Sequence, residues 1–173
     1  MNRLSNRRYH QPRRRAFSLF EAVISSLLVG TLMVSATRAV SSSILSQRRM
    51  ADRSKAAWLA DALVAELHQQ SYMEPGATSS TLGRETGETS DSRVTYDDVD
   101  DYVGFSESPP KDKDGTTLTN LIGWQRSVSV QWVSLNDIAA VSGSETGVKK
   151  ATVTVSFNNQ LVLTRIIIRT KGG

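Results

Sequence analysis

The chain has 173 residues, of which 39% are hydrophobic, 22% charged and 6% aromatic. This length suffices for one domain with a modest core, and the hydrophobic content argues against a wholly disordered chain. The absence of cysteine excludes disulfides, thiolate catalysis, thiolate zinc sites and iron–sulfur clusters, and two histidines are too few for a histidine-rich metal site.

Positive charge is concentrated at the N-terminus. Six of the 21 Lys and Arg residues lie within residues 1–16, which contain no acidic residue. The other 15 stand against 17 acidic side chains, a balance of −2. A basic terminal segment can bind nucleic acid. The apolar segment that follows favours a membrane instead.

Residues 17–37 form an apolar segment of 21 residues in which Glu21 is the single charge. As a helix it would cover about 30 Å, the thickness of a bilayer's hydrocarbon core. The larger positive cluster, Arg13 to Arg15, precedes it, and Arg38 follows it. The positive-inside rule therefore predicts a cytoplasmic N-terminus and a C-terminal domain across the membrane. A buried helix of a soluble core is the alternative.

Glu21 is unusual in such a segment. A charged side chain at mid-membrane costs about 2.5–3.5 kcal/mol on insertion scales, so it calls for a partner or a function. The simpler interpretation is a carboxyl close to the membrane interface that reaches headgroups or stays protonated.

The stretch RRRAFSLFEAVISSLLVG, residues 13–30, resembles the N-terminal signature of type IV prepilins and of type II secretion pseudopilins. The resemblance implies cleavage by a prepilin peptidase between Ala16 and Phe17 and N-methylation of Phe17. It also implies that Glu21 sets register by pairing with the N-terminal amine of a neighbouring subunit. Ala16 replaces the family's usual glycine. The residues expected to pack between helices are Leu19, Phe20, Val23, Ile24, Leu27, Leu28 and Gly30.

By the same resemblance, the chain is a structural minor subunit of a pilus or pseudopilus and not an enzyme. The implied partners are the prepilin peptidase, other pilin or pseudopilin subunits, inner-membrane lipid and the inner-membrane assembly platform. The implied location is the inner membrane, in a single pass, and then the filament. No cofactor and no direct binding of nucleic acid are expected.

Two other classes of protein fit parts of the N-terminal pattern. Arg14-Arg15-Ala16-Phe17 is similar to a twin-arginine export signal, and Val34-Ser35-Ala36 is a plausible signal-peptidase site. Either would release a soluble secreted protein. A single-span anchored protein with an extracytoplasmic binding head, which forms no filament, is the main alternative function.

The helical pattern continues past the apolar segment. No proline occurs between Pro12 and Pro75, and one apolar stripe recurs at helical spacing. We therefore predict one helix from about Phe17 to Gln70. The predicted parts are a cleaved leader (1–16), a transmembrane or filament-core helix (17–40), its amphipathic continuation (41–72) and a β-rich head (73–173). The stripe comprises Ala56, Leu59, Ala60, Leu63 and Leu67.

Polar and acidic segments follow the helix. Residues 74–92 are rich in Gly, Ser, Thr and Glu, which predicts a solvated loop. The four aspartates within residues 97–101 favour a solvated acidic surface over a calcium site. Asp112 and Asp114 are weak calcium candidates, because the later ligands of a calcium loop are missing after Gly115.

The last third of the chain has strand patterns. Apolar and polar residues alternate over residues 124–132 and 151–157, and Asn158-Asn159 predicts a tight hairpin into residues 161–170. The predicted fold class is α+β, a long N-terminal helix packed against a C-terminal antiparallel sheet, as in pilins. The segments WLADALVAEL, YDDVDDYVGFSESPP and WQRSVSVQWV also resemble minor pilins of the mannose-sensitive haemagglutinin pilus type.

Overall fold

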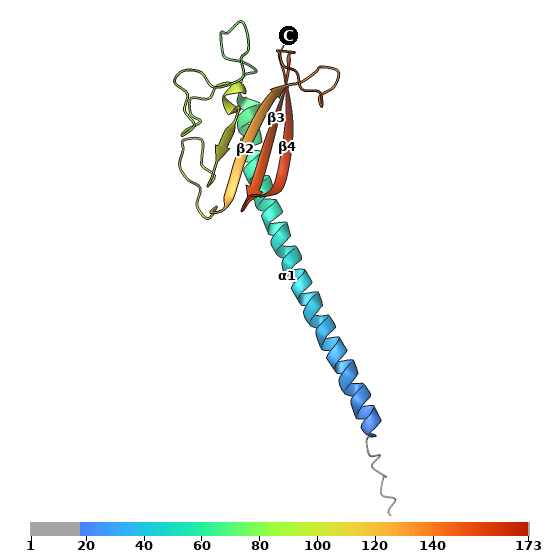
Figure 1. Ribbon diagram of the computed structural model, residues 1–173. Coiled ribbons are helices and arrows are strands. Elements are labelled where there is room, and N and C mark those ends of the chain that lie inside the picture. The colour runs from blue at the N-terminus through green and yellow to red at the C-terminus, as the bar shows by residue number, and fades with distance from the viewer. Residues whose placement is uncertain (1–17, 173) are drawn as a thin grey trace, which may run out of the picture. The chain divides into compact units, whose positions relative to one another are not determined.

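The computed structural model of the chain describes residues 18–172. It has one long helix followed by a four-stranded antiparallel sheet, so the predicted α+β class is confirmed (Figure 1). In chain order the elements are α1 (Leu19–Gln69), the 3₁₀ helix η1 (Asp100–Tyr102), β1 (Phe105–Glu107), β2 (Trp124–Trp132), β3 (Val148–Phe157) and β4 (Gln160–Thr170).

Helix α1 is 51 residues long and ends one residue before the predicted boundary. Its length follows from the sequence, since a single glycine and no proline interrupt the segment. The chain divides into two compact units between Gln47 and Arg48, so α1 contributes to both. The units are described separately below.

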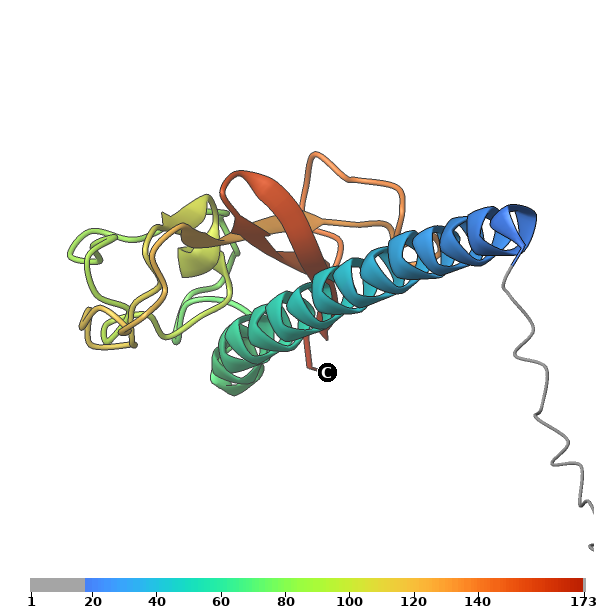
Figure 2. The ribbon, with the colours of Figure 1, turned by 90° about the horizontal axis from the view of Figure 1, so that it is seen from below.

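In the C-terminal unit, one stripe of α1 is completely buried. Ala56, Leu59, Ala60, Leu63 and Leu67 have no exposed surface, as the apolar spacing predicts. Burying a leucine side chain contributes about 1.5–3 kcal/mol, so this stripe holds the helix on the sheet. Figure 2 shows the sheet lying along this part of α1.

The sheet has the order β1-β2-β3-β4, with each strand antiparallel to the next. Val128 of β2 lies opposite Val153 of β3, and the inward residues alternate with polar ones along both strands. The predicted turn between β3 and β4 is confirmed: Asn158 and Asn159 have φ of 49° and 63°. Positive φ at both central residues is typical of the type I′ turn, which asparagine tolerates.

The core lies between the helix stripe and the inner face of the sheet. Trp124 belongs to this core, whereas Trp132 is only half-buried. The inward strand residues of the core are Val128, Val130, Ala151, Val153, Val155 and Ile167, and Tyr96, Val99, Tyr102 and Phe105 close its β1 end.

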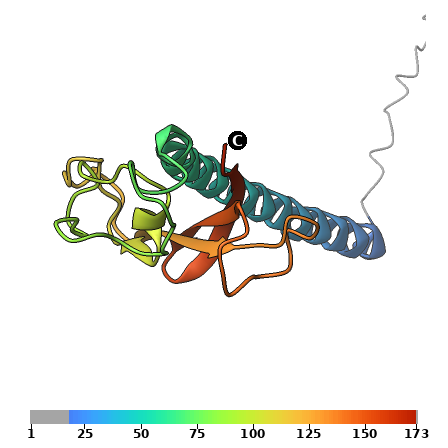
Figure 3. The same cartoon turned by 90° about the horizontal axis from the view of Figure 1, so that it is seen from above.

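Two of the three long loops of this unit lie together on the β1 side of the sheet. Figure 3 shows residues 70–99 (green) and 108–123 (gold) together there, and residues 133–147 (orange) apart from them. Backbone hydrogen bonds join the first two loops, for example from Arg93 N–H to the Lys113 carbonyl (2.9 Å). Residues far apart in sequence therefore meet in this region.

Candidate functional site

The first candidate site is the N-terminal part of α1, whose side chains are exposed along its whole described length. Leu19 is 86% exposed, Phe20 73% and Leu27 67%. In the described part of the chain, α1 is the one helix long and apolar enough to span a membrane. All the residues predicted to pack between helices lie here and are exposed: Leu19, Phe20, Val23, Ile24, Leu27, Leu28 and Gly30.

Five hydroxyl groups of this segment are satisfied by the helix itself. Ser26 Oγ donates a hydrogen bond to the Ala22 carbonyl, and Ser35 Oγ donates one to the Thr31 carbonyl, each at 2.9 Å. Thr31, Thr37 and Ser41 bond in the same way. A hydroxyl that is already hydrogen-bonded loses less when it leaves water. The segment is therefore chemically suited to an apolar environment.

Glu21 is the one acidic side chain of this segment, and its carboxylate is exposed in the first turn of α1. It forms no ion pair with any residue of the described range 18–172. A negative charge near a helix N-terminus gains about 0.3–1 kcal/mol from the helix dipole. Ala16 and Phe17, the predicted cleavage and methylation sites, lie outside the described residues.

Gly30 lies inside the continuous helix. An added Cβ there would have no heavy atom within 4 Å, so no contact with residues 18–172 requires a glycine at this position. The resemblance gives it a role between subunits instead.

The second region of interest is the acidic run of the C-terminal unit. The prediction of a solvated acidic surface is wrong for three of its four aspartates: Asp98, Asp100 and Asp101 are at most 1% exposed, and only Asp97 is exposed. The reason is local for Asp98 and Asp101, which cap backbone groups around η1, whereas Asp100 is paired with Lys149. Asp98 Oδ1 accepts hydrogen bonds from the backbone N–H of Asp100 and Asp101, and Asp101 Oδ2 accepts from Asp97 and Asp98.

Asp112 and Asp114 lie in an exposed turn. Asp114 Oδ1 accepts the backbone N–H of Thr116 at 2.9 Å, and this hydrogen bond lowers the pKa of Asp114. Neither aspartate belongs to a group of three close carboxylates within the described residues. The geometry of the turn is explained by its backbone hydrogen bonds.

Sequence reasoning missed a network of buried charges between the helix and the sheet. Arg93 Nε lies 2.8 Å from Glu66 of α1, and Arg93 Nη1 lies 3.0 Å from Glu107 of β1. Arg126 of β2 also pairs with Glu107, with 2.7 Å between Nε and Oε1, and donates to the Leu59 carbonyl of α1. These contacts fix the helix, β1 and β2 together.

A second buried pair joins β3 to η1. Lys149 Nζ lies 2.6 Å from Asp100 Oδ2, and both side chains are at most 1% exposed. The strand alternation held a signal for both networks, since Arg126 and Lys149 are in phase with inward valines and alanine.

No protein-family model, curated protein or solved structure matches this chain. The features that indicate a function are therefore the helix, its exposed apolar surface and the buried charges of the C-terminal unit.

Proposed function

We propose that this chain is a structural minor subunit of a type IV pilus or of a type II secretion pseudopilus. The observation that carries the proposal is the apolar N-terminal part of α1, which is exposed throughout and carries one carboxylate. Each large apolar side chain gains about 1.5–3 kcal/mol on leaving water. Lipid before assembly and neighbouring helices after it would both supply that burial.

The proposed processing gives Glu21 its partner. A prepilin peptidase would cut between Ala16 and Phe17 and leave an N-methylated amine at Phe17. The ammonium of one subunit would then neutralise Glu21 of the next. An unpaired charge in an apolar environment is costly and a paired one much less so, so pairing would favour one register between helices.

The proposed location follows from charge. Arg13 to Arg15 would hold the N-terminus on the cytoplasmic side of the inner membrane, and the head would be extracytoplasmic. The assembly platform of the inner membrane would then move the subunit into the filament. The proposal is non-enzymatic and includes no cofactor and no direct contact with nucleic acid.

A membrane-anchored protein that forms no filament is the second candidate. The position of Glu21 in the first helical turn favours it, because the helix dipole stabilises a carboxylate there without a second subunit. In that case α1 would anchor the head, and the head would bind its ligand outside the membrane.

Replacing Glu21 distinguishes the two functions. In a filament, Glu21→Ala removes the partner of the neighbouring amine, so we expect the variant to insert at least as well as the wild type and to be lost from sheared filaments. Ser25→Ala, one turn along the same face, is the matched control and should be incorporated normally. Immunoblots of the membrane fraction measure insertion, and immunoblots of the sheared filaments measure incorporation. Normal incorporation of Glu21→Ala would contradict the filament proposal.

A further inference from the structure

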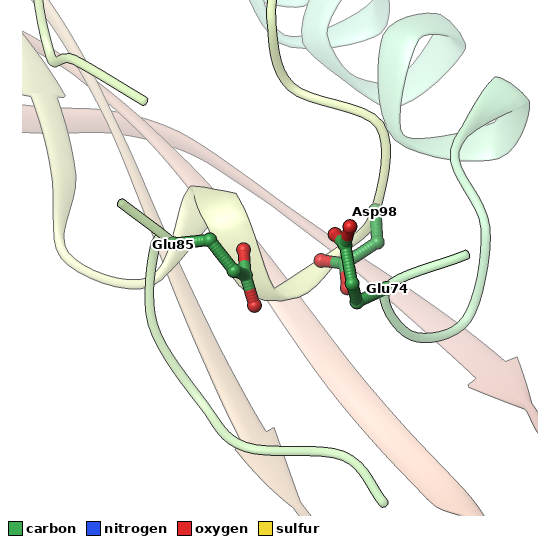
Figure 4. A group of neighbouring side chains, drawn as sticks. All are labelled: Glu74, Glu85 and Asp98. Atoms are coloured by element: carbon green, nitrogen blue, oxygen red, sulfur yellow. The ribbon is translucent and has the colours of Figure 1, made fainter. Parts of the chain in front are cut away.

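Five carboxylates meet in the loops on the β1 side of the sheet. They come from separate segments: Glu74 just after α1, Glu85 and Glu88 in the loop predicted to be solvated, and Asp98 and Asp101 around η1. They form two groups of three, Glu74–Glu85–Asp98 and Glu85–Glu88–Asp101. Within each group the oxygens lie within 4.8 Å of one another, and Glu85 belongs to both. Figure 4 shows the first group converging from its three segments.

Three of these carboxylates bury an oxygen that has no hydrogen-bond partner in the described residues. These oxygens are Glu85 Oε2, Asp98 Oδ2 and Asp101 Oδ1. Asp98 and Asp101 are completely buried, and the second oxygen of each is fixed by backbone N–H groups. A buried carboxylate oxygen without a partner costs free energy, so the unpartnered oxygens of Glu85 and of one aspartate in each group point to a cationic ligand.

The other buried carboxylates of the protein provide an internal comparison. Glu107 pairs with Arg93 and Arg126, and Asp100 pairs with Lys149. Within residues 18–172, none of the five clustered carboxylates has a Lys, Arg or His nitrogen within 4.0 Å. The other buried acids are therefore paired directly with cations of the chain, whereas the charge of Lys149 acts on Asp98 only from beyond 4.0 Å.

The pKa values of two clustered carboxylates reflect the same excess of negative charge. Burial, followed by the charges of Asp100 and Asp101, raises the pKa of Asp98 to about 7. Burial, together with the nearby carboxylate of Asp101, raises the pKa of Glu88 to about 8. Protonation relieves the repulsion between these carboxylates, and a bound cation would relieve it in the same way.

We propose that this cluster binds Ca²⁺, with Glu85 as the central ligand. Calcium takes six to eight oxygen ligands in flexible geometry, which carboxylates from several loop segments can supply, whereas Mg²⁺ demands a near-ideal octahedron and keeps its waters. The ion would fasten residues 74–88 to the segment around η1 and so order the longest loop of the head. This site differs from the Asp112 and Asp114 turn, and it does not depend on filament assembly.

The test is thermal unfolding of the full-length chain in non-ionic detergent, after removal of metals with a chelator. Added CaCl₂ should raise the Tm by roughly 10 °C when its concentration is a hundredfold above the dissociation constant. MgCl₂ at equal concentration should give a much smaller rise. Isothermal titration with CaCl₂ at physiological ionic strength should show saturable binding. Absence of saturable binding at millimolar CaCl₂ would overturn the proposal, as would an equal rise with MgCl₂.

Two variants test whether Glu85 is a calcium ligand or a residue that only stabilises the fold. Glu85→Gln keeps the size of the side chain and relieves repulsion, so without calcium its Tm should equal or exceed that of the wild type, and CaCl₂ should no longer raise it. Asp112→Asn is the matched control and should keep the full calcium response. A calcium response retained by Glu85→Gln, or lost in Asp112→Asn, would contradict this location of the site. A lower metal-free Tm for Glu85→Gln would indicate a structural role instead.

Discussion

At the scale of single residues, Arg126 shows how this head uses charge inside its core. It is 1% exposed, yet it pairs with Glu107 and donates to a carbonyl of α1. Burying a guanidinium costs several kcal/mol, which only well-placed partners offset. A buried ion network of this kind fixes the position of the helix relative to β1 and β2, because each partner tolerates only a narrow geometry.

Removing the shared acid of this network should therefore be severe. Glu107→Gln leaves Arg126 buried without its counter-charge and Arg93 with Glu66 alone, so we expect the free energy of unfolding to fall by about 3–5 kcal/mol. Denaturant unfolding followed by tryptophan fluorescence measures this, because Trp124 lies in the core.

The control for this prediction is an exposed ion pair. Asp61 and Arg165 lie 3.1 Å apart but are 58% and 41% exposed, so Asp61→Asn should cost no more than about 1 kcal/mol. Similar losses for Glu107→Gln and Asp61→Asn would show that the buried network contributes no more than a surface contact.

At the scale of elements, α1 combines two surfaces that the sequence already distinguishes. In the C-terminal unit α1 buries one apolar stripe and leaves Trp58 57% exposed, whereas residues 19–45 are exposed on all sides. The helix, its stripe, strands β2 to β4 and the Asn158–Asn159 turn were predictable because each depends on local periodicity or on the φ of single residues. Strand β1 was not predicted, because three residues are too few to show a period.

The acidic loops were not predictable in the same way. The position of Glu85 beside Asp98 depends on how two loops fold back on each other, and neither loop has a repeating pattern. The inward positions of Arg126 and Lys149 could be read from strand alternation, but charged residues usually face solvent, so their burial was not expected.

The two surfaces of α1 predict opposite outcomes for the same substitution. Leu63→Ala leaves a cavity in the core and should lower the free energy of unfolding of the head by about 2–5 kcal/mol. Leu27, which is 67% exposed, contributes nothing to that core, so Leu27→Ala should leave the fluorescence-detected unfolding unchanged. If the proposed filament forms, less of this variant should be recovered in sheared filaments. Equal destabilisation by the two substitutions would contradict this division of the helix.

At the scale of the whole molecule, the chain has a head that is stabilised internally and a helical segment whose apolar side chains are exposed in the described residues. The head buries its apolar stripe and pairs most of its buried charges. The N-terminal segment of α1 buries nothing in the described structure. Such a combination fits a protein whose function lies in what its N-terminal segment contacts.

The mass of the mature N-terminus is the most direct test of the proposed processing and assembly. Mass spectrometry of the protein purified from its native host should find a chain that begins at Phe17 with a methylated α-amine. A chain that still begins at Met1 would contradict the pilin proposal and support a plain membrane anchor. A chain that begins near Thr37 would contradict both and identify an exported protein that has lost its apolar segment.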